Sequence, residues 1–557
     1  MKQCRFLSLL LLVAFVAGCN APSRKTADPG EILSEYMADA TPEPGDVLRL
    51  LLPAEMPHLN PLTSTDYYAS TVLAWVFDTL LDRDQETLES QPALAERWEI
   101  SEDHLAYTFY LRRDVVFSDG APLTARDVKF TFDKVMDPAV DAPNLRNYYI
   151  DIRECEVLDE YTVRFVCNEA YYQHLIMLGG LSIIPEHIYG EGDFNRHANN
   201  RKPVGSGMYT LEEWETGQRI SLHRNDSYWG TREKGWPWFD RIEYAIIPDD
   251  NTAFQVLTKG ELDFMSMPAE LFMRRANTAR FQQRFNRFAY FRPAYNYLGW
   301  NMRKSMFQDK RTRQALTMLL DRELIRDEIY YGQAEVIAGN FMPGSAEWNE
   351  DIEPWPFDPE RAKELLARMG WEANEKTGLL ERNGIPFRFD AATTNQNPVA
   401  EKVLTLYKEE LARVGIELTI RLMEWASLLE RVDKREFDAI LMGWSMPPDP
   451  DPYQVWHSSQ ADAGSNYVGF INPEADEIVE AARRSFDKEE RIRLYKRFQE
   501  ILHEEQPYLF LLTPKVLAAG DKRLHGIQVY PFGVDQREWF VPRDLQRISR
   551  EGMPVKP

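Results

Sequence analysis

The chain is long and strongly acidic: it has 557 residues, with 88 Asp and Glu against 65 Lys and Arg, and a formal net charge of −23. This balance excludes a nucleic-acid partner, which would require a basic face, and it disfavours tight electrostatic attachment to anionic lipid. A chain of this length can bury a large core and is expected to form several domains or one large architecture with split domains.

The N-terminus predicts export. The apolar run FLSLLLLVAFVAGCN follows Lys2 and Arg5, and its core of about a dozen residues is too short to span a bilayer as a helix. A basic start, a short apolar middle and small residues at the end are typical of a secretory signal peptide, here residues 1–18. The final VAGC is similar to a bacterial lipobox and predicts a lipid on Cys19. The alternative is an apolar anchor with a cysteine present by chance.

Residues 19–45 are predicted to form a flexible tether, because they mix proline, glycine, small and charged residues without an apolar period. Order is expected to begin near Asp46. The segment DVLRLLLP then predicts a buried strand, and the apolar residues of 70–81 have helical spacing. A strand-rich region follows, with a helix predicted after the N-cap Thr124.

Two cysteines remain in the predicted mature domain, Cys155 and Cys167, in an oxidising compartment where disulfides form. The sequence ECEVLDEYTVRFVC predicts a hairpin around Asp159 and Glu160. A two-residue loop would place Cys155 opposite Arg164 and Cys167 on the other face of the sheet, which prevents a bridge. A longer loop or a bulge would allow one, so the sequence leaves the disulfide open.

From residue 203 the pattern changes to glycine turns and paired strands, and the glycines of PVGSGMY are expected to form a strand turn or a close backbone approach. Helices are predicted to start at Asp250 and after the N-cap Asp358. A further helix from about Pro398 ends at Gly415 and leads directly into an alternating strand. Helix and strand in alternation predict an α/β fold with a mainly parallel or mixed sheet.

Several charged residues are expected to be structural rather than to contact a ligand. Asp119 and Gly120 predict a tight turn before a helix. Asp309, Arg311 and Arg313 precede an apolar helical segment, so they are predicted to form a solvated helix start with local ion pairs.

Seven stretches spread over nearly the whole mature chain occur together in order: PALAERWEISEDHLAYTFYLRRDVVFSDGAPLTARDV, PVGSGMY, LTKGELDF, YLGWNMRKSMFQDKRTRQALT, FDPERAKELLARMGW, FDAILMGW and GSNYVGFINPEADEIVEAARRSFDKEERIRLY. With them, the chain from Asp46 to about Asp544 resembles the family 5 extracellular solute-binding proteins, the oligopeptide and dipeptide receptors of ABC importers. Seven ordered matches are far more specific than any one of them.

The resemblance implies a periplasmic-binding-protein-like α/β fold with two lobes, mixed sheets and a hinge. Lobe I would comprise residues 46–84, 204–292 and 512–557, with a subdomain of residues 85–203 inserted in it, and lobe II residues 293–511. Such a protein encloses a small solute when the lobes close and passes it to the permease subunits of an importer. A di- or oligopeptide is the leading ligand, with a sugar oligomer or chelated nickel as alternatives within the family. The expected location is periplasmic or extracytoplasmic, where the lipid would hold the protein, as a monomer, on a bacterial membrane.

The segment GWSMPPDPDPYQVWHSSQ is the candidate pocket wall. It leaves an apolar strand and presents aromatic and acidic residues on a proline-stiffened loop, and ligands of such sheets tend to lie beyond strand ends. Aromatic rings supply apolar area and carboxylates pair with an ammonium group, as a peptide receptor requires. The alternative is an irregular surface loop whose aromatic residues pack inward, and a structural role is expected for His457. The predicted ligand-binding residues are Trp444, Asp449, Asp451, Tyr453 and Trp456.

One position departs from the pattern of the family that the chain resembles. In its peptide-binding members, an aspartate follows the Gly-Trp pair after two more residues and pairs with the ammonium group of the peptide. This chain has Pro447 at that place, and a proline cannot neutralise a buried cation. Either Asp449 or Asp451 takes this role from a shifted loop, or the ligand presents no free amino terminus there.

An exported hydrolase is the alternative from a different functional class. The sequence contains no HExxH zinc helix, no GxSxG elbow and no paired CxxC metal site. Carboxylates are too plentiful in this acidic chain for any pair of them to indicate a glycosidase. We therefore predict a binding protein with no enzymatic activity, no cofactor and no metal site.

Overall fold

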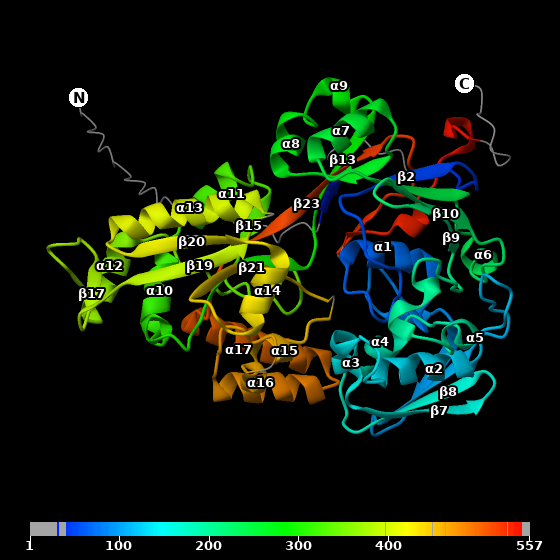
Figure 1. Ribbon diagram of the computed structural model, residues 1–557, viewed down its shortest axis with the longest axis horizontal. Helices are drawn as coiled ribbons and strands as arrows, with labels where there is room; N and C mark the ends of the chain where they lie inside the picture. The colour runs from blue at the N-terminus through cyan, green and yellow to red at the C-terminus, as the bar shows by residue number, and fades with distance from the viewer. Residues whose placement is uncertain are drawn as a thin grey trace, which may run out of the picture.

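The computed structural model describes residues 30–32 and 40–548, apart from residues 396, 448, 463 and 532. Figure 1 shows two main bodies, with strand β23 (Leu512–Asp521) passing from one to the other. Within the described part of the chain, no helix is both long enough and apolar enough to cross a membrane. The predicted signal peptide and Cys19 lie outside the described residues. The names lobe I, inserted subdomain and lobe II are used below for the residue ranges predicted from the sequence.

One sheet of lobe I has the strand order β2-β11-β10-β9. The predicted first strand is confirmed as β2, which runs parallel to β11, whereas β10 is antiparallel to both β11 and β9. Helix α1 packs against this sheet through contacts with β9. The bounds are β2 (Val47–Leu52), β9 (Tyr209–Glu215), β10 (Arg219–Arg224), β11 (Arg241–Ile246) and α1 (Tyr67–Val76).

The glycines of PVGSGMY let the chain pass close to the end of α1. A Cβ atom on Gly205 would lie only 2.0 Å from the carbonyl oxygen of Val76, and the backbone N–H of Gly207 donates to that same oxygen at 2.9 Å. A side chain at Gly205 would therefore displace the helix end. The chain turns after Val76 and forms β3 (Leu81–Arg83), so the predicted helix is shorter at its C-terminal end.

The second sheet of lobe I has the strand order β1-β13-β23-β12. β13 (Phe285–Phe291) and β12 (Phe264–Ser266) flank β23, and β1 (Gly30–Ile32) adds to the free edge of β13. This short strand corrects the expectation that order begins near Asp46. Pairing with an open strand edge uses backbone hydrogen bonds and needs no apolar period, so no periodic signal marks β1.

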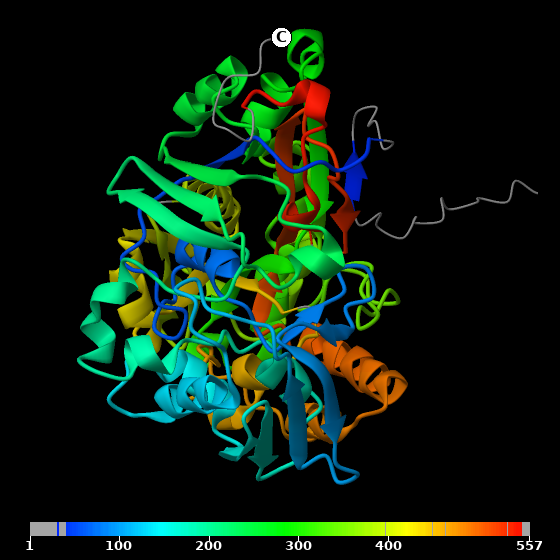
Figure 2. The ribbon, with the colours of Figure 1, turned by 90° about the vertical axis from the view of Figure 1, so that its right-hand side faces the viewer.

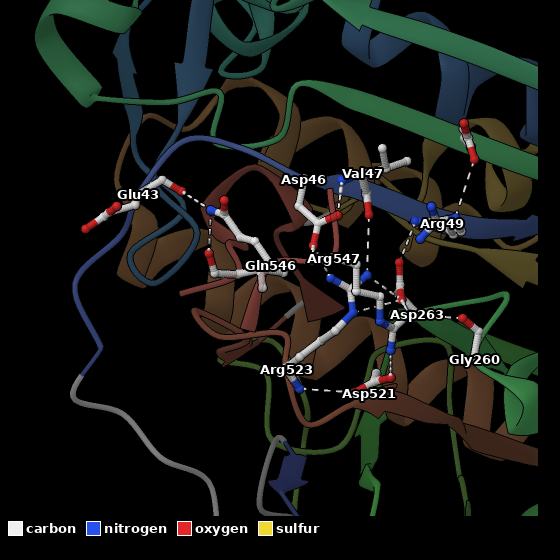
Figure 3. A network of polar contacts seen from close by, with 12 residues as sticks. Glu43, Asp46, Val47, Arg49, Gly260, Asp263, Asp521, Arg523, Gln546 and Arg547 are labelled. Atoms are coloured by element: carbon white, nitrogen blue, oxygen red, sulfur yellow. Dashed lines mark hydrogen bonds and ion pairs between the residues drawn. The ribbon is translucent and has the colours of Figure 1, made fainter. Parts of the chain in front are cut away.

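A buried ion network joins the start of β2 to the C-terminal part of the chain (Figure 3). Arg523 Nη1 lies 2.6 Å from Asp46 Oδ2, and Arg523 Nη2 lies 2.6 Å from Asp263 Oδ1, with both carboxylate side chains 0% exposed. The backbone N–H of Arg547 donates to Asp46 Oδ2 at 2.9 Å, and its Nη2 lies 2.8 Å from Asp521 Oδ2. Three segments that are far apart in sequence are thereby held together inside lobe I.

The inserted subdomain contains an antiparallel sheet of order β5-β6-β8-β7 with helix α2 against it. Thr124 caps α2 as predicted, and Asp127 completes a capping box. The subdomain lies at the opposite end of this body from α7 (Asp250–Lys259) (Figures 1 and 2). The bounds are β5 (Ala95–Ile100), β6 (Ala106–Leu111), α2 (Ala125–Met136), β7 (Ile152–Asp159) and β8 (Thr162–Cys167).

Cys155 and Cys167 are free thiols, and both are buried. A bulge at Leu158 shifts the hairpin register, so that Cys155 pairs with Phe165 instead of its predicted partner, and Cys167 pairs with Ile152. The two thiols therefore share the buried face of the sheet, so of the two alternatives left open the bulge is the one observed, and the two-residue loop is not. They are not cross-strand partners, because each cysteine pairs with a different residue of the other strand.

The sheet of lobe II has the order β20-β19-β21-β14-β22. β19 runs parallel to β20 and β21, while β14 is antiparallel to β21 and β22, so the predicted mixed sheet is confirmed. The predicted helix before Gly415 is α13, and Gly415 ends it with φ +81°. The strand bounds are β14 (Ala294–Trp300), β19 (Arg388–Thr394), β20 (Glu417–Met423), β21 (Ala439–Ser445) and β22 (Tyr508–Phe510). Helix bounds are α10 (Lys310–Met318), α12 (Pro359–Arg368), α13 (Pro398–Arg413), α14 (Trp425–Asp433), α16 (Pro473–Arg484) and α17 (Lys488–Glu505).

The charged start of α10 is only partly as predicted. Asp309 caps the helix and pairs with Arg311 at 2.6 Å. Arg313, however, is 1% exposed, and its guanidinium donates to the backbone carbonyls of Phe307 and Glu505. The predicted solvated role is wrong for Arg313, because the end of α17 brings unpaired helix carbonyls to it.

Candidate ligand-binding site

The predicted pocket wall begins at the end of β21, where Trp444 is half-buried. Trp444 Nε1 donates to Tyr508 Oη at 3.3 Å, and its ring is nearly parallel to those of Tyr297 and Tyr467, with interplanar angles of 6° and 5°. These contacts fix the indole while leaving part of it exposed. A fixed aromatic surface of this kind can hold the apolar part of a ligand at low entropic cost.

Asp451 lies where lobe II meets the inserted subdomain. The hydroxyl of Tyr171 donates to Asp451 Oδ2 at 2.6 Å, and Arg483 Nε lies 3.1 Å from the same oxygen. The carboxylate is therefore shared between a neutral donor from the subdomain and a cation from lobe II. A hydrogen bond to an ionised acceptor is among the stronger kinds in proteins.

Arg483 is enclosed by aromatic rings from both sides of this contact. Its Cζ atom lies 4.3 Å from the ring centroid of Tyr171 and 4.3 Å from that of Tyr453. Burial acts to lower the pKa of Arg483, but Asp451 and Tyr171 together outweigh it, and the pKa is raised above its usual value. Tyr453, predicted as a ligand residue, is thus placed within the contact between the subdomain and lobe II.

Two further subdomain residues bond the backbone of the predicted loop. Tyr172 Oη donates to the carbonyl of Pro450 at 2.9 Å, and Gln173 Nε2 donates to the carbonyl of Asp449 at 2.5 Å. We name as the interlobe contact the set of Tyr171, Tyr172 and Gln173 of the subdomain bonded to Asp449, Pro450, Asp451 and Arg483 of lobe II. No local pattern in the sequence marks Tyr171, Tyr172 or Gln173, because their hydrogen-bond partners lie 276 to 280 positions further along the chain.

Trp456 lies deeper than the other predicted site residues. It is 1% exposed, and its ring centroid lies 4.5 Å from that of Tyr508 within the core of lobe II. His457 is 9% exposed and bonds Ser459 and Glu480, in keeping with its expected structural role. The structure therefore brings Asp449, Asp451 and Tyr453 together at the contact between the subdomain and lobe II, whereas Trp456 is buried in the core of lobe II.

A second feature, not predicted from the sequence, is a cavity of about 300 Å³ beside α1. Its volume is at the lower end of the range for small-molecule sites. Polar and charged groups of lobe I gather at Asp78, which follows α1. Asp78 Oδ2 accepts from Trp229 Nε1 at 3.0 Å and from Ser206 Oγ at 3.1 Å. Ser206 lies between the two glycines of PVGSGMY, so the close approach of that loop also brings a hydrogen-bond donor to Asp78.

Burial raises the pKa of Asp78 to about 7, although the hydrogen bonds from Trp229 and Ser206 act in the opposite direction. Asp82, also on the wall, lies 3.1 Å from Lys234 Nζ and 2.9 Å from Arg537 Nη1. Burial acts to raise the pKa of Asp82, but Arg537 and Lys234 together lower it. The two carboxyl groups therefore differ: Asp82 is paired with cations, and Asp78 is not.

Replacing Asp78 by Asn is expected to change the pH dependence of stability. A carboxyl group with a usual pKa near 3.8 and a folded pKa of about 7 favours folding only while it is protonated. Relative to Asp78→Asn, the free energy of unfolding of the wild type should fall by about 1.4 kcal/mol for each pH unit between about pH 4 and 7. Urea denaturation of both proteins across this range measures the difference, and a difference that stays constant with pH would contradict the assignment.

The profile described as "Bacterial extracellular solute-binding proteins, family 5 Middle" matches residues 89–466. The oligopeptide-binding protein AppA of Bacillus subtilis (strain 168) is 31% identical over 563 residues, covering 97% of each chain. The structure of AppA from Bacillus subtilis in complex with a nonapeptide matches with a TM-score of 0.78 at 30% identity, covering 90% of this chain and 100% of that one. NikZ from Campylobacter jejuni in complex with Ni(L-His) matches with a TM-score of 0.74 at 25% identity, covering 90% of this chain and 100% of that one.

Two bodies linked by a crossing strand, which touch again beside an aromatic and acidic loop, define a two-lobed solute-binding protein. The chain belongs to the bacterial extracellular solute-binding proteins, family 5. The resemblance noted in the sequence and the two-lobed α/β fold are both confirmed. The chain is accordingly a binding protein of the extracytoplasmic space and not an enzyme.

Proposed function

We propose that this protein is the substrate-binding lipoprotein of an ABC importer and that it captures an oligopeptide when its two lobes close. Similarity over nearly the full length to an oligopeptide-binding protein, and to its nonapeptide complex, supports this proposal. The observation that carries it is the interlobe contact, in which the hydroxyl of Tyr171 in the inserted subdomain donates to Asp451 of lobe II. Bonds between lobes stabilise only a closed arrangement, and an enclosed ligand shifts the population towards it.

The test is to find out what the protein carries. Native mass spectrometry of the protein purified from its source would identify a retained solute by its mass. Added at a hundred times its dissociation constant, the right peptide should raise the free energy of unfolding by about 2.7 kcal/mol. Stabilisation by a nickel chelate or a sugar oligomer but by no peptide would overturn the peptide assignment. Cleavage of the peptide during incubation would contradict a binding role.

Asp449 is the residue that we assign to the ammonium group of the peptide. Asp451 is already bonded to Tyr171 and Arg483, whereas Asp449 engages the subdomain through its backbone carbonyl. Burial raises the pKa of the Asp449 carboxyl group, so a cationic ligand group beside it would stabilise the ionised form. Pro447, which stands at the position of the family aspartate, would then be compensated from two positions further along the loop.

Asp449→Asn is expected to weaken peptide binding by at least about 1 kcal/mol, because it removes a charge-assisted contact. Isothermal titration calorimetry measures the loss, and circular dichroism checks that the ligand-free variant is folded. Asp433→Asn is a matched control, since Asp433 is an exposed carboxylate at the end of α14 in the same lobe. Equal affinities for wild type, Asp449→Asn and Asp433→Asn would remove Asp449 from the site.

The lipid on Cys19 is part of the same proposal. The basic residues, short apolar run and VAGC motif before it support an acylated N-terminus that holds a monomer on the outer side of a bacterial membrane. Cys19→Ala should move the protein from the membrane fraction to the soluble fraction. Mass spectrometry of an N-terminal peptide that carries no acyl chain would contradict the proposal.

A further inference from the structure

The cavity beside α1 has one carboxylate with a free acceptor atom. Both hydrogen bonds to the side chain of Asp78 end on Oδ2, and within the described residues Oδ1 accepts none. Asp78 lies on the cavity wall. A carboxylate oxygen that faces a cavity without a donor is incompletely satisfied, and a cation with N–H groups would satisfy it.

The remaining charges on the wall do not neutralise Asp78. Lys234 and Arg537 both bond Asp82, at 3.1 and 2.9 Å, and Arg537 also lies 2.7 Å from Asp535. Counting these groups, three carboxyl groups face two cations, and Asp78 is the carboxyl group that no cation pairs with. The site therefore favours a positive group from outside rather than an anion.

The rest of the wall fits the stem of a long side chain. Leu73, Phe77, Met208 and Tyr228 provide apolar surface, while Ser70 and Ala74 mark the exposed face of α1 from which a ligand group could enter. Lysine and arginine side chains combine an apolar stem with a cationic end. They therefore match a cavity whose wall is apolar and which also contains a carboxyl group. A cavity of about 300 Å³ is large enough to receive one such side chain.

We propose that this cavity is a specificity site for a basic side chain of the ligand, with Asp78 as the residue that receives its ammonium or guanidinium group. The proposal rests on the peptide-binding function proposed above and deepens it: the protein would select peptides that contain lysine or arginine. The raised pKa of Asp78 adds a second property. Binding of a cation near pH 6 should displace the proton from Asp78. The titratable and charged groups that face it are Asp82, Tyr228, Lys234 and Arg537. Arg537 and Lys234 together lower the pKa of Asp82, and burial raises the pKa of Tyr228, so neither of these two groups exchanges a proton near pH 6.

The experiment compares alanine nonapeptides that carry one lysine, at each position in turn, with the same peptides carrying norleucine. For the wild type, titration calorimetry should show at least one lysine position that binds ten-fold or more tightly than its norleucine counterpart. Asp78→Asn, which keeps an acceptor for Trp229 and Ser206, should reduce that ratio to less than about three-fold without weakening the norleucine peptide. At about pH 6, titrations in two buffers of different ionisation enthalpy should show proton release by the wild type only.

Two further measurements keep the outcome decisive. Ala74→Phe fills the cavity from the exposed face of α1 without changing a charge, and it should abolish the lysine preference even if Asp78→Asn does not fold. n-Butylguanidinium, compared with n-butanol, probes the cavity without a peptide. Binding of this cation in the absence of any peptide binding would overturn the peptide function and leave the cationic site standing. No lysine preference in the wild type, a preference that survives both substitutions, or no binding of n-butylguanidinium would overturn the cationic site.

Discussion

Replacing Arg523 by methionine is expected to lower the free energy of unfolding by about 3–5 kcal/mol, because it removes the more buried of the two arginines in the network and leaves the carboxylates in place. Arg523 is 6% exposed and lies 2.6 Å from both Asp46 and Asp263, whose side chains are fully buried (Figure 3). Methionine restores much of the side-chain volume, so the loss reports the uncompensated charges rather than a cavity. Urea denaturation followed by circular dichroism measures it.

An exposed arginine in the same lobe provides the control. Arg219 in β10 pairs with Glu213 at 2.8 Å and with Glu215 at 3.0 Å, but the three side chains are 38–47% exposed to solvent. Solvent screens such pairs, so Arg219→Met should leave the denaturation midpoint almost unchanged. Similar midpoints for Arg523→Met and Arg219→Met would show that the buried network does not stabilise lobe I.

The sequence predicted contacts between neighbouring residues well, and it did not predict contacts between distant segments such as those of this network. Local rules worked when both partners lie within one turn of helix, as at Thr124, whose hydroxyl and backbone meet Asp127 three residues later. The strand periods and the helix end at Gly415 were predicted correctly for the same reason. The family resemblance supplied the two lobes, which no local pattern could provide.

What could not be predicted depends on contacts between distant segments. Arg313 follows a helix start like any solvated arginine, and only the fold brings the carbonyl of Glu505 to it, 192 positions later. Asp451 was predicted from its charge and its place after a strand, but its bond to Tyr171 spans 280 positions and could not be inferred from either segment alone. The cavity at Asp78 was missed because its wall combines residues from 61 to 537. In each case the sequence shows which polar or charged side chains are present, but it does not show which of them the fold brings into contact.

The interlobe contact leads to the second large effect, which is on ligand affinity. Tyr171→Phe removes the hydroxyl that joins the subdomain to Asp451, while Arg483 still neutralises the carboxylate. A hydrogen bond to a charged group contributes about 1.5–3 kcal/mol. If that bond forms only when the lobes are closed, the closed state loses this amount relative to the open state, and ligand affinity should fall about 10- to 150-fold. Calorimetry with the retained peptide measures the affinity, and small-angle scattering compares the empty and loaded forms.

Tyr149→Phe separates closure from general loss of stability. The hydroxyl of Tyr149 donates to the carbonyl of Met177 at 2.7 Å, inside the inserted subdomain, and Tyr149 is 3% exposed. This variant also loses a buried hydrogen bond, so its unfolding midpoint should fall, but its ligand affinity should match that of the wild type. Tyr171→Phe should show the opposite pattern, because the bond it loses holds the two lobes together rather than the subdomain. Equal affinity losses in the two variants would mean that the contact of Tyr171 with Asp451 supports the fold of the subdomain and does not hold the lobes closed around a ligand.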